Sequence, residues 1–324
     1  MPRSTGFSAL SSVTAAKRPG SDPGLTPLRR ILQSLPGIIP ASVQPPASHG
    51  RTEEARIVPA TCIEQPMLVR NPGPAEVCPH PLAFLDGVQR HEVVGYVGTL
   101  PLILGEVAAA VRERNQRDAR TIIARRRSVV IGRPEALAVI PNEFETLALG
   151  TEDSPHPLRD LELARSALDR ARGEIERQVG DEYRRRSPNW LIVDGSLAES
   201  PGWATDAHMI GVSKSHATLP FEGADLAIYL QLPAAHRSSI FQPASRQWAP
   251  VYAWALRLWD WTGKDLFYGL VRVEMAPRAE TLELADTVSR WLMAERAPVS
   301  SDPRWDRLLY GIHGVEEFLR AGFR

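Results

Sequence analysis

The sequence predicts an α/β fold in which a mixed sheet is flanked by helices, and three observations support this. Short apolar runs with strand character follow one another between residues 82 and 133. A long amphipathic segment begins at residue 157. Further strand-like runs and two terminal helical segments follow it. Strands, a long helix and more strands in this order are typical of a mostly mixed sheet covered by helices.

The composition is that of an ordinary globular chain. Its 324 residues are 43% hydrophobic, enough for a sizeable core in one large domain or two modest ones. Lys plus Arg and Asp plus Glu each number 38, so a nucleic-acid partner would need a local basic patch. Two cysteines are too few for a disulfide framework. We expect a cytoplasmic protein.

The sequence predicts no membrane segment. The amino terminus has no continuous apolar run of the kind a secretory signal requires. The most apolar long stretch, residues 93–111, is interrupted by Pro101 and Glu106. Such interruptions are unfavourable in a membrane span, so this stretch is expected to belong to the body of the protein.

Proline divides the chain into two parts. Half of the 28 prolines fall within the first 81 residues, and they oppose regular structure there. We predict that residues 1–65 form a Pro-rich, largely disordered extension and that residues 66–324 form the functional domain. One short helix is expected in "TPLRRILQSL", with Thr26 as its cap and Pro27 in its first turn. It would dock on the body or on a partner.

Three strands are predicted at the start of the domain. "LAFLDGVQR" indicates a strand ending near Asp86, "EVVGYVGTLPLIL" a second extended stretch, and residues 125–133 a third. Short strands in succession favour an antiparallel meander.

A long helix is predicted over residues 157–180. Apolar residues recur there at spacings of three and four, at Leu161, Ala164, Leu168, Ala171, Ile175 and Val179. A helix of about 20 residues is about 30 Å long, enough to cross one face of a sheet.

The remaining elements follow in order. "NWLIVDGSL" predicts a strand ending at Asp194, and residues 208–216 predict another. "PVYAWALRLWDW" and "LFYGLVRVEM" predict a hairpin with a turn at residues 262–265. Helices are expected within residues 280–297 and 304–320.

Two acids stand at the predicted ends of apolar strands, and each is followed by glycine, as Asp86-Gly87 and Asp194-Gly195. Asp and Gly after a strand are commonly turn residues. If the two strands are neighbours, however, the carboxylates lie close together and repel unless one is protonated or a cation intervenes. Mg²⁺ and Mn²⁺ prefer oxygen ligands, so a divalent-cation site is the functional alternative.

The long helix offers a third acid. Glu162, beside the apolar stripe, is the best-placed candidate, although a solvated acid in the first turn is an equally ordinary explanation. Glu174 and Glu176 are rivals nearer the carboxyl end, where acids oppose the helix dipole. Carboxylates on two strands and a covering helix that hold two metal ions are typical of two-metal phosphoryl transfer.

Other residues are compatible with a phosphodiester substrate. Lys214 is either a surface lysine or a group that steadies a phosphate. His313 is either an ordinary helix histidine or a metal ligand or proton shuttle. Arg272 and Glu274 share one strand face, where they pair or line a cleft. Basic runs at residues 125–127 and 184–186 are solvated surface or phosphate contacts, and tryptophans are core residues or base-stacking surfaces.

These motifs together resemble the NurA family of DNA-end-processing nucleases. The resemblance rests on "LDGVQR", "RDLELARSAL", "WLIVDGSL", "IGVSKS", "YGLVRVE" and "LLYGIHGVEEFL", which span roughly residues 82–320. It implies a ribonuclease-H-like core and nuclease activity that depends on Mn²⁺ or Mg²⁺, with two ions. It assigns metal binding to Asp86, Glu162, Asp194 and His313 and places Lys214 near the scissile phosphate. It also implies a homodimer that works on DNA with a HerA-type hexameric ATPase.

The sequence therefore predicts a metal-dependent DNA nuclease acting in end resection, repair or defence. The alternative is a non-catalytic dimeric adaptor of the same fold that binds DNA ends or an ATPase. Val88 favours this alternative, because the family often has serine after Asp-Gly. A small-molecule hydrolase is disfavoured, since the chain has no Gly-x-Ser-x-Gly motif.

Overall fold

The computed structural model describes residues 26–40, 55–115, 118–150, 154–244, 249–298 and 307–323. Its main sheet has the strand order β3-β13-β14-β15-β10-β9-β5-β6-β7-β8. The strands are β1 (Ile39–Pro40), β2 (Arg56–Ile57), β3 (Ala60–Cys62), β4 (Val69–Arg70), β5 (Leu82–Val97), β6 (Leu100–Asn115), β7 (Asp118–Gly132), β8 (Thr146–Ala148), β9 (Trp190–Asp194), β10 (Met209–Ser213), β11 (Thr218–Leu219), β12 (Arg237–Ser238), β13 (Phe241–Pro243), β14 (Tyr252–Arg257) and β15 (Leu270–Met275). The helices are α1 (Thr26–Gln33), α2 (Pro134–Leu137), α3 (Pro157–Arg186), the 3₁₀ turn η1 (Leu197–Glu199), α4 (Pro201–Thr205), α5 (Gly223–Leu230), α6 (Ala279–Glu295) and α7 (Tyr310–Ala321).

The predicted mixed sheet flanked by helices is confirmed. Strands β5, β6 and β7 form a long antiparallel meander, whereas β5, β9 and β10 run parallel to one another. Strand β15 then pairs antiparallel with both β10 and β14. The predicted hairpin is therefore β14–β15, although the segment that joins the two strands, residues 258–269, is longer than the predicted four-residue turn.

The predicted end of the first strand at Asp86 is wrong. Strand β5 continues for eleven residues beyond Asp86, to Val97, because its pairing with β6 continues on the other side of Gly87. The second predicted stretch, residues 92–104, spans the turn between β5 and β6. The parallel pairing with β9 nevertheless stops at Leu85, so Asp86 lies at the end of that ladder inside a longer strand.

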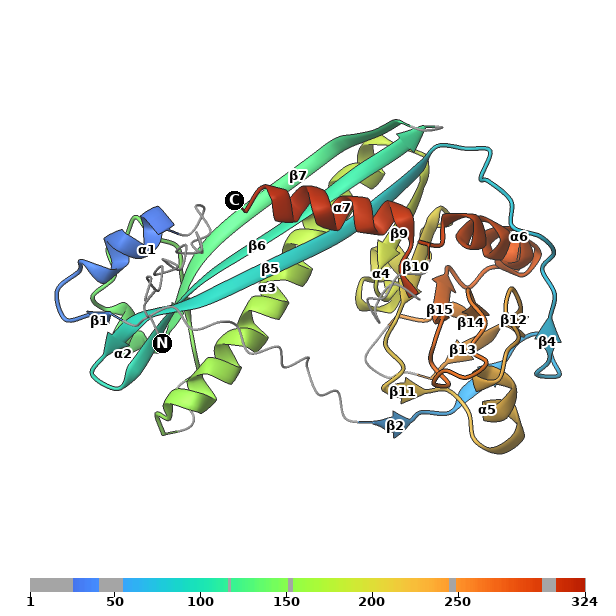
Figure 1. The fold of residues 1–324 in the computed structure, drawn as a ribbon, viewed down its shortest axis with the longest axis horizontal. Coiled ribbons are helices and arrows are strands. Elements are labelled where there is room, and N and C mark those ends of the chain that lie inside the picture. The colour runs from blue at the N-terminus through green and yellow to red at the C-terminus, as the bar shows by residue number, and fades with distance from the viewer. Residues whose placement is uncertain are drawn as a thin grey trace, which may run out of the picture.

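Two apolar layers cover the faces of the sheet. Helix α3 packs on β5, β6 and β7 through a buried stripe that contains Leu168, Ile175 and Val179. Helices α6 and α7 cover the other face, where Phe84 belongs to the same buried cluster as Ile312 of α7. Figure 1 shows α7 in front of the β5–β7 strands and α3 crossing behind them. The predicted helix at residue 157 is confirmed, but it runs to Arg186 rather than to residue 180.

Helix α1 lies against the meander. Leu32 is fully buried, Arg29 Nη1 lies 2.9 Å from Glu92 Oε2, and Gln33 Nε2 donates to the Val94 carbonyl over 2.9 Å. The short helix predicted in the Pro-rich segment therefore docks on the body of the protein. The side chains of its proposed cap and first proline, and residues 1–25 and 41–54 of the predicted extension, lie outside the described residues. Residues 55–65 of the predicted extension are described, and they carry β2 and β3, of which β3 pairs with β13 in the main sheet.

The cysteines Cys62 and Cys78 are free thiols. Within the described ranges, none of the helices combines the length and apolar character that crossing a membrane requires.

Candidate functional site

The register between two parallel strands brings Asp86 and Asp194 together. Leu85 of β5 pairs with Val193 of β9, so the next residue on each strand is an aspartate. The condition on which the sequence argument depended, that these two strands are neighbours, is thus met. Asp86 is buried, with 8% of its surface exposed, and its Oδ1 accepts a hydrogen bond of 2.7 Å from the Gly87 amide.

The surroundings of Asp86 oppose its ionisation. Burial raises the pKa of the Asp86 carboxyl well above its usual range, and the nearby charges of Asp194 and Glu176 raise it further. Lys214 acts in the opposite direction. Three carboxyl groups are therefore close enough to influence one another electrostatically. A bound proton or cation would relieve their mutual repulsion.

Lys214 reaches this region from β10. That strand pairs parallel with β9 and places Val212 opposite Asp194, so the chain leaves β10 beside the end of β9. The Lys214 ammonium Nζ lies 2.7 Å from Asp194 Oδ2. Both side chains are about a quarter exposed, so this cation is accessible to a ligand as well as to Asp194.

Among the acids of α3, Glu176 is the one that contacts β5 beside Asp86. A methyl group added at Gly87 would lie 2.7 Å from the Glu176 Cγ atom and 2.8 Å from its Cδ atom. The end of the Glu176 side chain thus rests directly on the glycine of β5. Burial raises the pKa of Glu176 to about 7, and the Asp194 charge adds to this rise, while Arg172, 2.7 Å away on the same helix, opposes it.

Glu162 lies elsewhere. It occupies an exposed position of α3, fourteen residues before Glu176 and therefore about 21 Å away along the helix axis. The structure does not bring it together with Asp86 and Asp194. Glu174, the other rival, is exposed and lies 3.6 Å from Arg127 Nη1.

The helix-dipole argument against Glu176 does not hold, because α3 extends to Arg186 and Glu176 is ten residues from its end. A usable signal was present in the sequence. Glu176 adjoins the buried Ile175 and has Arg172 four residues before it, a spacing that allows an ion pair on one helix face.

His313 lies on α7, which covers the face of the sheet opposite α3. Phe84 of β5 packs against α7, and because residues two apart on a strand share a face, Asp86 lies on the α7 side of β5. A Cβ atom at Gly311 would overlap the Phe84 ring, so the first turn of α7 crosses β5 two residues before Asp86. His313 is 19% exposed, and its Nε2 lies 3.3 Å from Glu317 Oε1. Its predicted role stays a prediction.

Arg272 and Glu274 form a structural contact. Arg272 Nε donates to Glu274 Oε1 over 2.9 Å. The other oxygen of Glu274 accepts hydrogen bonds from the Ser196 hydroxyl and the Leu197 amide, at 2.7 and 2.9 Å. Glu274 is 2% exposed, and its hydrogen bonds hold the loop that follows β9. It thereby supports the position of Asp194 at the end of that strand.

The basic runs have protein partners. Arg125 pairs with Glu182 at 2.5 Å and Arg184 with Asp206 at 2.8 Å. Arg126 donates to the Gly322 carbonyl. Four of the tryptophans are buried, namely Trp190, Trp203, Trp254 and Trp291. Core packing accounts for these tryptophans.

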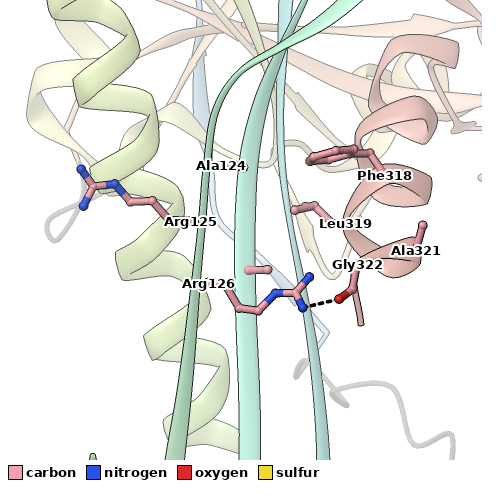
Figure 2. Close-up of a pocket in the computed structure, with 8 residues that line it drawn as sticks. Ala124, Arg125, Arg126, Phe318, Leu319, Ala321 and Gly322 are labelled. Carbon is pink, nitrogen blue, oxygen red and sulfur yellow. Dashed lines mark hydrogen bonds between the residues drawn. The ribbon is translucent and has the colours of Figure 1, made fainter. Parts of the chain in front are cut away.

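A groove of about 410 Å³ lies between β6, β7 and the end of α7. Figure 2 shows Arg126 and Phe318 on its walls, with the Arg126 guanidinium bonded to the Gly322 carbonyl. The acids described above do not line it. This groove and the acid cluster are therefore separate features.

The donor set suits a hard cation. Asp86, Glu176 and Asp194 offer carboxylate oxygens, which Mg²⁺ and Mn²⁺ prefer. Their mutual repulsion around a buried carboxyl is what such a cation would relieve. In the part of the chain that the structure describes, no three His, Cys, Asp or Glu side chains already meet in a metal-binding arrangement. Asp194 is paired with Lys214, and Glu176 is paired with Arg172.

The fold and the acid cluster define a mixed α/β protein with carboxylates gathered where a parallel strand ladder ends. No family model and no curated protein matches the chain. Among solved structures, it is similar to the crystal structure of the NurA nuclease from Sulfolobus solfataricus, with a TM-score of 0.48, 9% sequence identity, and coverage of 77% of this chain and 83% of that chain. The match is to the family that the sequence motifs resemble. At this level of similarity neither substrate nor activity transfers to this chain.

Proposed function

We propose that this chain is a metal-dependent DNA nuclease. The observation that carries the proposal is that Asp86 and Asp194 stand on neighbouring strands where the β5–β9 ladder ends, while Glu176 rests on Gly87 in electrostatic range of both. Lys214 accompanies them as an accessible cation. Carboxylates that hold divalent cations are typical of two-metal phosphodiester hydrolysis.

The three carboxylates would hold Mn²⁺ or Mg²⁺, as two ions. When bound, divalent cations supply an activated water and stabilise the leaving oxygen in phosphoryl transfer. The side chain of Lys214 would meet the negative charge of the phosphate and of the transition state. Glu274 would keep the loop after Asp194 in place through its bonds to Ser196 and Leu197.

The remaining expectations stay part of the proposal. A ribonuclease-H-like classification of the core, a role for His313, a homodimer and a HerA-type ATPase partner follow from the motif resemblance alone. The same holds for action in end resection, repair or defence. DNA is the substrate we propose, because the resemblance is to DNA-end-processing nucleases.

The test is cleavage of end-labelled single-stranded and duplex DNA with Mn²⁺, Mg²⁺ or chelator. We expect metal-dependent cutting by the natural protein and its loss in Asp194→Ala. Asp118→Ala is the matched control, since Asp118 is an exposed aspartate on β7. Retained cleavage in a folded Asp194→Ala protein would reject the assignment.

An adaptor without activity is the second candidate. The pairing of Asp194 with Lys214 and of Glu176 with Arg172 favours it, because these ion pairs neutralise two of the acids without a metal. Calorimetric titration with Mn²⁺ separates the two candidates. Binding that disappears in Asp86→Asn and Asp194→Asn supports the nuclease, whereas no binding together with retained DNA affinity supports the adaptor.

A further inference from the structure

The contact between β5 and α3 at Gly87 distinguishes Glu176 from the other acids of the helix. Gly87 lies within β5, in a backbone conformation open to any residue, so no turn requires glycine there. The space that a side chain at residue 87 would occupy is instead taken by the end of Glu176. A Cβ atom would lie 2.7 Å from Glu176 Cγ, and the carboxylate oxygen Oε1 is closer still.

The space left by Gly87 is filled by a carboxylate rather than by an apolar group. Gly105 of β6 provides the contrast, because it also lies beneath α3 and a Cβ atom there would lie 2.7 Å from the Leu168 Cδ1 atom. Close packing alone explains Gly105. At Gly87, the same close approach brings a partly buried acid onto the strand that carries Asp86.

Arg172 completes the arrangement from the helix side. Its Nη1 donates to Glu176 Oε1 over 2.7 Å, and the pair is partly buried. Glu176 is thus held between the strand backbone and a guanidinium group, in electrostatic range of Asp86 and Asp194.

We propose that Gly87 is a positioning residue: its missing side chain leaves the opening into which Glu176 projects, and this opening lets α3 supply the third carboxylate of the site. The inference rests on the proposed nuclease function. A side chain at residue 87 displaces Glu176 while leaving Asp86 and Asp194 on their strands.

The test compares Gly87→Ala, Gly105→Ala, Glu176→Gln and the double variant Gly87→Ala/Glu176→Gln in Mn²⁺-dependent DNA cleavage and in Mn²⁺ calorimetry. Displacing a catalytic group by about 1 Å costs about a hundredfold in rate, so we expect Gly87→Ala to lose about that factor in kcat. Gly105→Ala should stay near the natural rate. The double variant should be no slower than Glu176→Gln, because residue 87 acts through Glu176.

Cleavage by Gly87→Ala within threefold of the natural rate would overturn the inference, as would a loss that multiplies with that of Glu176→Gln. If the natural protein does not cut DNA at all, the proposed function fails and Mn²⁺ calorimetry decides the positioning role. Weaker Mn²⁺ binding in both Gly87→Ala and Glu176→Gln supports that role, and unchanged binding in Gly87→Ala rejects it.

A fold defect is handled by a further variant. If Gly87→Ala lowers Tm, Glu176→Ala in the same background removes the opposing side chain. Its Tm should then return to that of Glu176→Ala alone. Failure to return would show that residue 87 clashes with something other than Glu176 and would reject the inference.

Discussion

Helix α3 carries two acids whose surroundings differ. Asp160, in its first turn, is fully buried and accepts three hydrogen bonds from Arg133, at 2.9 to 3.1 Å. Glu176, in its second half, shares its region with two further carboxyl groups, and the pKa of the Asp86 carboxyl is raised there by burial and by like charge. The first region is balanced in charge and the second is not. A balanced buried pair serves the fold, whereas an excess of buried acid marks a place where a cation is useful.

The largest expected effect is the loss of DNA cleavage when Glu176 loses its charge. Glu176→Gln keeps the shape of the side chain and removes its charge, so we expect DNA cleavage to fall about a thousandfold, as for loss of a group that stabilises the transition state. Stability should not fall, since like-charge repulsion is relieved. Glu162→Gln on the same helix is the control and should stay within about twofold. Equal losses in the two variants would contradict the site described here.

The second prediction concerns the buried ion pair between Arg133 and Asp160. Arg133→Met leaves Asp160 buried without its partner, so we expect the free energy of unfolding to fall by about 3 kcal/mol. Urea denaturation measures this, and the specific activity of the folded fraction should be unchanged. The double variant Arg133→Met/Asp160→Leu should recover most of the loss, since an apolar pair needs no charge compensation. A larger deficit in the double variant would count against this explanation.

The third prediction concerns pH. The pKa of Glu176 is about 7 in the folded protein against an ordinary 4.5, so between these values the folded state holds a proton that the unfolded state has lost. Stability therefore falls as pH rises from about 4.5 to 7, by about 2.5 kcal/mol from this group. Unfolding in chelator across this range should show a shallower slope for Glu176→Gln than for the natural protein. Parallel curves would mean that Glu176 does not titrate in this window.

The smallest effect is expected at an exposed pair. Arg320 and Glu316 on α7 lie 2.6 Å apart, and the Arg320 side chain is 61% exposed. Because water and salt screen such a pair, Arg320→Ala should change the free energy of unfolding by less than about 0.5 kcal/mol. Thermal unfolding at low and high salt measures it. A loss comparable to that of Arg133→Met would undo the distinction between balanced burial and surface pairing.

Most elements of the fold could be predicted from local patterns. The apolar stripe of α3 and the alternation in β14 and β15 gave the right element types, because a helix or strand that buries one face repeats its apolar residues at its own period. The boundaries were less accurate. The strand through Asp86 continued beyond the Asp-Gly pair because the partner strand β6 supplies hydrogen bonds that local sequence does not reveal.

The candidate site was also partly predictable from local patterns. Asp86, Asp194 and Lys214 follow apolar strand segments, and the structure brings these three together. The choice of Glu162 over Glu176 depended on the end of the helix, and that end lies six residues beyond the predicted one.

The sequence by itself determined that apolar strands and a long amphipathic helix would form, and that two of those strands would each carry an Asp-Gly pair, because these features depend on neighbours along the chain. The tertiary structure alone decided that β9 stops beside Asp86 and that Glu176 meets Gly87. Strand register and the close approach of a helix to a sheet depend on residues about ninety to one hundred and ten positions apart, and the local sequence pattern does not contain that information.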